Sequence, residues 1–309
     1  MPKRIIPPLL PANAHMRVIA PSCSAKTINA PILASAQRAL EAIGFRISFS
    51  EHMFELNRFQ SSSVDSRIVD LHTAFLDPTV DGILAVRGGF NENDLLDKID
   101  WSTIAQHPKV FCGYSDNTIL QNALFAKIGM VSFSGPNFAT FSSLQGRSYT
   151  IRGFINAVQG GFTTPTQNKD TIAVIQKGRA QGTIMGGNLC TFNLLQGSRY
   201  QPHLANAILF LEDDHISPLD PLEFYRNLQS LMHLPEFKLV QGIVFGKFAP
   251  ASKLPPQEIA KIVASKPELS KIPILANLNF GHTLPMFTFP IGGKAVINTA
   301  AKDPLTISL

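Results

Sequence analysis

Residues 110–128 read Val-Phe-Cys-Gly-Tyr-Ser-Asp-Asn-Thr-Ile-Leu-Gln-Asn-Ala-Leu-Phe-Ala-Lys-Ile. The first four residues form an apolar run closed by a glycine, which predicts a short buried strand. After the turn, apolar residues recur at the spacings of one helix face: Ile119, Leu120, Ala123, Leu124 and Ile128. A strand that passes through one tight turn into a helix is the building unit of α/β proteins.

The same alternation of strand and helix continues on both sides of this stretch. Strands are predicted at 16–20, 45–49, 82–86 and 131–133. Helices are predicted at about 32–43 and 64–75. Repeated units of this kind predict an α/β fold with a mostly parallel sheet and helices on both faces. Ligands of such sheets bind beyond the carboxyl ends of the strands.

The pattern changes near the middle of the chain. Between residues 144 and 178 the periodicity weakens into Gln, Gly, Thr, Pro and Asn, which is typical of a connection between domains. The second half has one predicted helix at 222–232. Its predicted strands are 207–211, 242–245 and 274–278, with short strands around Phe287, Ala295 and Thr306. We therefore predict an N-terminal α/β domain over 1–145, a connecting segment over 146–178 and a smaller β-rich domain over 179–309.

Composition excludes several classes of protein. The 309 residues allow two domains, since one domain spans roughly 100–200 residues. The net charge is +5, but the basic residues are scattered singly, so we predict no nucleic-acid partner. No apolar run approaches the roughly 20 residues that cross a bilayer, so we predict no membrane partner. The charge at most favours anionic small substrates.

The cysteines and the N-terminus bear on location. Cys23, Cys112 and Cys190 are far apart and odd in number, which indicates reduced thiols in a cytoplasmic protein. The N-terminal residues imitate a signal peptide, but three prolines interrupt its short apolar part. We therefore expect a loose N-terminal arm and a cytoplasmic location.

Ser115 lies at the turn between the predicted strand and helix. This is the geometry of a nucleophile elbow, in which the next backbone N–H, here that of Asp116, binds the oxyanion formed when serine attacks a carbonyl. The second glycine of the usual Gly-x-Ser-x-Gly motif is missing. From the local sequence alone, a helix N-cap is the simpler role for this serine.

Two other strand ends carry polar or flexible residues. Arg87-Gly88-Gly89 follows one strand, where paired glycines let backbone N–H groups approach an anion, although an ordinary turn explains them equally well. Glu212-Asp213-Asp214-His215 follows another. Because adjacent residues of an extended chain point to opposite faces, at most two of these side chains would converge on a metal. The alternatives are a solvated strand end and a carboxylate, Glu212, that orients a catalytic histidine.

His282 is a third residue at a strand end, after Asn279-Phe-Gly. A lone histidine is more often structural than catalytic. Ser115, Glu212 and His282 nevertheless each lie where an α/β sheet places catalytic groups. In that order they form a possible triad, in which the imidazole takes the serine proton and the carboxylate orients the ring.

The sequence resembles the LD-carboxypeptidase family of serine peptidases (peptidase family S66), which also contains the microcin C7 self-immunity proteins. The resemblance runs over nearly the whole chain and depends on the order and spacing of its motifs. The matching segments are Ile19–Ser22, Ala85–Phe90, Gly113–Asp116, Phe133–Pro136, Gly186–Asn188, Leu209–Asp213 and Asn279–His282.

The resemblance implies an N-terminal domain similar to class I glutamine amidotransferases and an active site between the two domains, often in a homodimer. It implies Ser115 as the nucleophile, Glu212 and His282 as its partners, and the backbone N–H groups of Gly88 and Asp116 as the oxyanion hole. It also implies that Gly187 and Asn188 line the substrate cleft. With Arg87 and Gly89, these are the predicted substrate-binding residues, and no metal or cofactor is predicted.

The resemblance also implies a substrate. The leading hypothesis is a serine carboxypeptidase that releases D-alanine from an L,D-linked peptidoglycan tetrapeptide. After Glu212-Asp213, however, the segment up to Arg226 departs from cell-wall-recycling members, and the chain looks closer to the microcin-immunity branch. The alternative is therefore an amidase that cleaves peptidyl or aminoacyl nucleotides. A two-domain binding protein without catalysis is the third possibility, although a binder has no need for all three triad residues.

Overall fold

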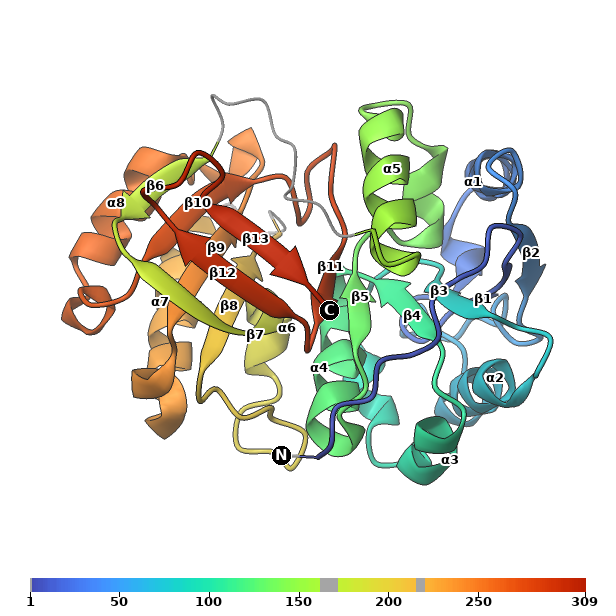
Figure 1. The fold of residues 1–309 in the computed structure, drawn as a ribbon. Coiled ribbons are helices and arrows are strands. Elements are labelled where there is room, and N and C mark those ends of the chain that lie inside the picture. The colour runs from blue at the N-terminus through green and yellow to red at the C-terminus, as the bar shows by residue number, and fades with distance from the viewer. Residues whose placement is uncertain (1, 162–171, 215–219) are drawn as a thin grey trace.

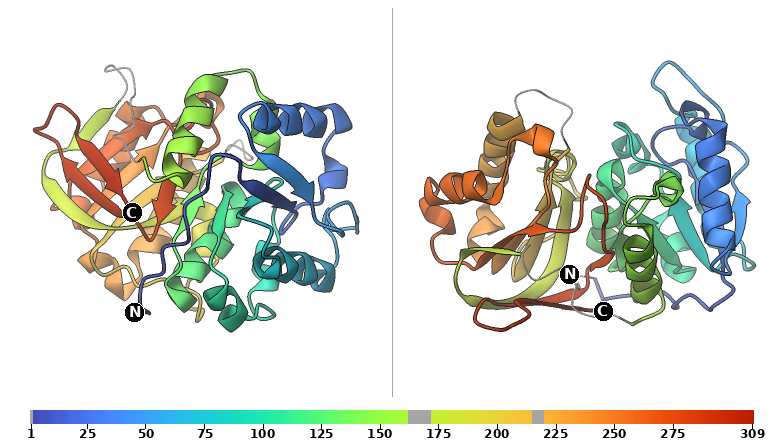
Figure 2. Two further views of the ribbon diagram at one scale, coloured as in Figure 1. Left: turned by 45° about the vertical axis from the view of Figure 1, so that its right-hand side comes forward. Right: turned by 90° about the horizontal axis from the view of Figure 1, so that it is seen from above.

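The chain folds into two sheets with their helices, and these lie side by side (Figure 1). This computed structural model describes residues 2–161, 172–214 and 220–309. Figure 2 shows the same two-part arrangement from two other directions. No helix in the described ranges is long and apolar enough to cross a membrane.

The first sheet confirms the predicted α/β fold. Its six strands have the order β11-β5-β4-β3-β1-β2, and all neighbours are parallel except β11 with β5. In chain order the elements of this half are β1 (His15–Ile19), α1 (Ala30–Glu41), β2 (Arg46–Phe49), α2 (Val64–Leu76), β3 (Gly82–Ala85), α3 (Trp101–Gln106), β4 (Val110–Gly113), α4 (Thr118–Ile128), β5 (Ser132–Ser134) and α5 (Arg147–Val158). The last strand, β11 (Phe289–Ile291), comes from the other half of the chain.

The second sheet has seven strands in the order β13-β12-β7-β8-β9-β10-β6. The central pairs from β7 to β10 are parallel, whereas β6, β12 and β13 are antiparallel to their neighbours. Its elements are β6 (Ala173–Gln176), β7 (Arg179–Asn188), α6 (Leu189–Asn193), β8 (Ala207–Glu212), α7 (Asp220–Met232), β9 (Gly242–Gly246), α8 (Pro256–Ala264), β10 (Ile274–Leu278), β12 (Lys294–Asn298) and β13 (Leu305–Ser308). The exact domain boundaries stay a prediction.

Several elements were not predicted. Helix α5 and strand β6 lie within 144–178, where the sequence showed no clear hydrophobic period. In α5 the period is weak because the helix buries only a narrow stripe of residues: Thr150, Phe154, Ala157 and Val158. Strand β7 was missed because it contains three glycines and buries only its last five residues fully. Tertiary contacts therefore outweigh weak local patterns in these elements.

The expectation of a loose N-terminal arm is wrong. Ile5 donates its N–H to Gly129 O at 2.8 Å and accepts from Val131 N at 2.8 Å. Leu10 N donates to Val158 O at 2.9 Å. The arm pairs in this way because its extended backbone forms a parallel bridge with the segment after α4 and meets the carbonyl of Val158, which the C-terminal end of α5 leaves unpaired.

Helix α4 joins the two halves of the molecule. Asn122 Nδ2 donates to Gly186 O at 2.7 Å, and Asn122 Oδ1 accepts from Gly186 N at 3.1 Å. Thr118 Oγ1 accepts from Asn188 N at 3.0 Å. These bonds attach the carboxyl end of β7 to the first turns of α4, directly beside Ser115.

Candidate active site

Ser115 lies at a sharp turn between β4 and α4. Its φ is +67°, in the left-handed region that few residues other than glycine adopt. Buried amides brace the turn. Asn137 Oδ1 accepts from Tyr114 N at 3.1 Å and from Asn117 Nδ2 at 3.2 Å, and Gln121 Nε2 donates to Gly113 O at 2.9 Å. Backbone strain that its surroundings hold in place is typical of functional sites.

The structure brings Ser115, Glu212 and His282 together. His282 Nε2 lies 3.0 Å from Ser115 Oγ, and His282 Nδ1 lies 2.7 Å from Glu212 Oε2. An ionised carboxylate can only accept, so Nδ1–H donates to Glu212 and leaves Nε2 of the neutral ring to accept from the serine hydroxyl. The side chain of Glu212 is only 3% exposed, which keeps water from competing for this bond.

Glycines allow this close approach of β8 and the segment after β10. Gly281 has φ +99°, and a Cβ there would lie 2.7 Å from Glu212 Oε2. A Cβ at Gly246 would lie 2.6 Å from Phe280 O and 3.0 Å from Glu212 Cβ. The edge of the Tyr114 ring packs against His282 with 5.1 Å between ring centroids. The imidazole is therefore fixed on both sides.

Acidic side chains set the protonation of this site. Burial alone lowers the pKa of His282, but the carboxyl groups of Glu212, Asp214 and Asp213 outweigh it and raise the pKa to about 8. The pKa of Asp213 is also raised to about 8, first by burial and then by Glu212 and Asp214. The acidic side chains around the imidazole therefore favour its protonated form, and burial favours the neutral form of Asp213.

Gly88 and Gly89 form a loop that lies directly on this turn. A Cβ at Gly88 would lie 2.8 Å from Ser115 Oγ and 3.2 Å from Asp116 N. A Cβ at Gly89 would lie 2.4 Å from Ser22 Oγ. Only residues without a side chain fit here, and the loop backbone therefore approaches the serine hydroxyl closely.

Two pockets open on either side of Ser115. The larger has a volume of about 770 Å³, and its lining includes Arg87, Gly88, Tyr114 and His282. The smaller has a volume of about 280 Å³ and is lined by Asp116, Asn188, Asp213 and Arg226, among others. Gly89, Phe90, Ser115 and Asp214 line both. A substrate with its reacting carbon at Ser115 would thus extend into both pockets.

The remaining predicted substrate-binding residues differ in position. Arg87 is exposed and faces the larger pocket. Gly187 packs against α4, where a Cβ would lie 2.5 Å from Thr118 Oγ1, and it is not among the residues that line either pocket. Asn188 caps α6 by accepting from Thr191 N at 3.0 Å, while its buried Nδ2 has no partner among the described residues. Asn188 is among the residues that line the smaller pocket.

A metal site would need several converging ligands. Over 2–161, 172–214 and 220–309, no group of three His, Cys, Asp or Glu side chains is placed to hold an ion. His215, the fourth residue of the acidic segment, lies outside the described residues.

Sequence reasoning missed the polar side chains that support the site. Asn117, Asn137, Gln121 and Asn122 are all nearly or completely buried. Gln121 and Asn122 lie in α4, a helix whose first turns are buried on all sides. Polar residues inside such a helix were the sequence signal that could have identified them. Buried polar groups must be hydrogen-bonded, so such residues point to a braced backbone nearby.

Both halves of the chain match domains of known proteins. Residues 16–135 match the LD-carboxypeptidase N-terminal domain and residues 181–297 match the LD-carboxypeptidase C-terminal domain. YocD of Bacillus subtilis (strain 168), itself assigned only by inference as a carboxypeptidase, is 42% identical over 92% of this chain and 93% of its own. The murein tetrapeptide carboxypeptidase of Pseudomonas aeruginosa is 27% identical over 93% of this chain and 94% of its own.

A solved structure extends the comparison to three dimensions. The MccF-like protein from Bacillus anthracis str. Ames superimposes with a TM-score of 0.93 and 40% identity, covering 99% of both chains. Both domain matches and the similarity to YocD cover the parts of the chain that carry the site. The chain therefore belongs to the LD-carboxypeptidase family.

Proposed function

We propose that this protein is a serine carboxypeptidase with Ser115 as the nucleophile. The observation that carries the proposal is the hydrogen-bonded series from Ser115 through His282 to Glu212 at the junction of two pockets. Ser115 Oγ attacks the scissile carbonyl carbon while its proton passes to His282 Nε2. His282 then gives that proton to the leaving amine, and water hydrolyses the acyl-enzyme by the same route.

The oxyanion hole is proposed to consist of the backbone N–H groups of Gly88 and Asp116. The close approach of Gly88 to Ser115 and Asp116 N supports this assignment. Donors held in place before the reaction stabilise the negative charge that develops on the carbonyl oxygen. Glu212 orients the imidazole and stabilises it once it is protonated.

The proposed substrate is an L,D-linked peptidoglycan tetrapeptide from which D-alanine is released. Arg87, exposed in the larger pocket, is proposed to bind the substrate carboxylate, with Gly89 and Asn188 contacting the peptide. Gly187 is proposed to act through its packing on α4. The similarity to the murein tetrapeptide carboxypeptidase of Pseudomonas aeruginosa supports this substrate class. A homodimer stays a prediction.

A second candidate function is cleavage of an aminoacyl or peptidyl nucleotide by the same residues. The similarity to the MccF-like protein at 40% identity favours it. The larger pocket, about 770 Å³ and bordered by the exposed ring of Phe90, also has room for a nucleoside.

A side-by-side assay tests the proposal. The purified protein is incubated with a muropeptide tetrapeptide and, separately, with an aminoacyl-sulfamoyl adenosine, and the released amino acid is quantified. We expect D-alanine from the tetrapeptide with the higher kcat/KM. Amino acid released only from the nucleotide would replace the first function with the second, and hydrolysis of neither would contradict both.

The activity should depend on pH through His282. The imidazole must be neutral to accept the serine proton, and its pKa is about 8. Protonation below that value removes the base, so kcat/KM should rise with pH through about 8 and then level off. A profile measured from pH 5.5 to 9.5 checks this, with Asp214→Asn expected to move the midpoint downward. A flat profile between pH 6 and 9 would contradict the assignment of the base.

A further inference from the structure

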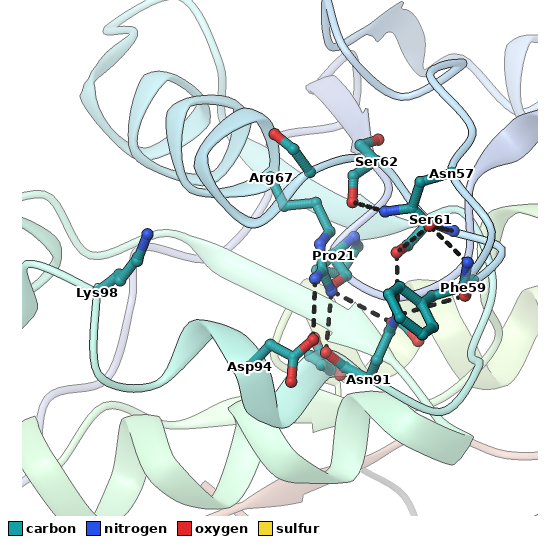
Figure 3. A network of polar contacts seen from close by, with 12 residues as sticks. Pro21, Asn57, Phe59, Ser61, Ser62, Arg67, Asn91, Asp94 and Lys98 are labelled. Carbon is teal, nitrogen blue, oxygen red and sulfur yellow. Dashed lines mark hydrogen bonds and ion pairs between the residues drawn. The ribbon is translucent and has the colours of Figure 1, made fainter.

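A buried arginine lies beneath the loop that carries Gly88 and Gly89. Arg67, on α2, is only 2% exposed. Its Nη1 donates to Asn91 O at 2.9 Å and to Pro21 O at 3.0 Å, and its Nη2 lies 3.4 Å from Asp94 Oδ2 (Figure 3). None of these residues is among those that line either pocket. The guanidinium makes these bonds through its two terminal nitrogens, while its buried Nε has no partner among the described residues. A buried charge is costly to separate from its partners, so the guanidinium constrains the segments that it joins.

Those segments form three walls of the larger pocket. Pro21 precedes Cys23, and Asn91 follows the loop with Gly88 and Gly89. Asn91 extends the connection, since its Nδ2 donates to Ser61 Oγ at 2.9 Å and to Phe59 O at 3.4 Å (Figure 3). Gln60, between these two, lines the pocket as well. One guanidinium thus connects walls that are far apart in the sequence.

The far side of the loop is tied to the serine turn itself. The buried carboxylate of Asp116 accepts from Glu92 N at 2.9 Å and from the Ser22 hydroxyl. Glu92 is completely buried, and burial and Asp116 raise its pKa well above the ordinary value. Arg67 is the cation that acts on both carboxyl groups. The loop from Gly88 to Glu92 is therefore held between Arg67 and Asp116.

We propose that Arg67 is a positioning residue that holds the backbone of Gly88 and Gly89 at its working distance from Ser115. The inference rests on the proposed function, because it assumes that Gly88 N–H binds the oxyanion. A donor contributes to catalysis only when it points at the place where the negative charge develops. The two glycines have no side chains that could anchor the loop, and the residues that follow them are bonded by Arg67 at Asn91 and by Asp116 at Glu92 N.

Arg67→Met and Arg67→Lys test this inference, with Arg17→Met as the matched control. Arg17, on β1 of the first sheet, has a side chain that is 16% exposed and bonds Asp77 at 3.1 Å and Ser48 at 2.7 Å. The measurements are kcat and KM on whichever of the two candidate substrates the protein cleaves, the Tm, and hydrogen–deuterium exchange of peptides covering 57–62 and 86–94. Methionine keeps the length and apolar bulk of the stem and removes the donors and the charge.

We expect Arg67→Met to lower kcat by roughly 10- to 100-fold, because a displacement of about 1 Å of a catalytic group costs that much. KM should change less than kcat, and exchange should accelerate at 57–62 and 86–94. Arg67→Lys, which keeps the charge and some of the donors, should fall between Arg67→Met and the unsubstituted protein. Arg17→Met should lower Tm without changing kcat or the exchange of these peptides.

Unchanged exchange at 86–94 in both Arg67 variants would overturn the inference, as would a kcat equal to that of the unsubstituted protein. If Arg67→Met does not accumulate as folded protein, Arg67→Lys provides the same readouts. If the unsubstituted protein hydrolyses neither substrate, the proposed function has failed. The exchange experiment then still decides whether Arg67 holds the loop.

Discussion

Replacing Ser115 with alanine is expected to lower kcat by roughly 10⁶-fold, which is the loss found when the nucleophile of a serine triad is removed. Alanine keeps the left-handed backbone of the turn and removes only the hydroxyl that lies 3.0 Å from His282 Nε2. The free energy of unfolding should therefore change little. Residual activity would come from binding and the oxyanion hole alone.

Two measurements check the expected loss at Ser115. One is kcat on the cleaved substrate, and the other is covalent labelling by a fluorophosphonate, which should modify the unsubstituted protein and not Ser115→Ala. Ser252→Ala is the control, because it also removes one serine hydroxyl, which here donates to Ala249 O at 2.8 Å, and Ser252 lines neither of the two pockets at Ser115. A Ser115→Ala protein that retained more than a few per cent of kcat would show that another group is the nucleophile.

Replacing Glu212 with glutamine should give the second largest effect, a fall in kcat of roughly 10⁴-fold, as when the carboxylate of a serine triad becomes an amide. The amide is nearly the same size, but its NH₂ group can donate to His282 Nδ1. That hydrogen bond favours the tautomer with the proton on Nε2, which cannot accept the proton of Ser115. Because Glu212 contributes most to raising the pKa of His282, the pH midpoint should also fall below about 8.

A surface pair provides the control for Glu212. Glu236 Oε1 lies 2.8 Å from His203 Nδ1, the same kind of glutamate–histidine contact at an exposed position. Glu236→Gln should leave kcat and the pH midpoint unchanged. If Glu212→Gln stayed within tenfold of the unsubstituted protein, the carboxylate would have no role in orienting the ring.

The fold was largely readable from local sequence where the local pattern was strong. The buried strands β1, β3 and β4, and helices α1, α2 and α4, were predicted because their apolar spacing is regular. Strand β7 and helix α5 were not, since glycines in one and polar residues in the other dilute the pattern. Their stability comes from packing against elements distant in sequence, which no local window contains.

The candidate site likewise contains residues that the sequence predicted and residues that it did not. Ser115, Glu212 and His282 could be named because each follows a recognisable strand within an ordered series of motifs, and glycine doublets marked the loop at Gly88. The supporting residues carried no such signal. Arg67, for example, lies on a helix face with nothing nearby in sequence that reveals its partners at Pro21 and Asn91.

Local periodicity and residue order were sufficient for the α/β fold and for the identities of the three side chains. Neither the periodicity nor the residue order showed that these three side chains contact one another. His282 reaches Ser115 across 167 positions and Glu212 across 70. The contact with Ser115 joins the two halves of the molecule, which the bonds between α4 and β7 hold together, whereas the contact with Glu212 forms within the second sheet, between the end of β8 and the segment after β10. Contacts this far apart in the sequence form only when whole elements pack. The raised pKa of His282 also depends on the tertiary structure, since the three carboxyl groups that raise it converge on the ring only in the folded chain.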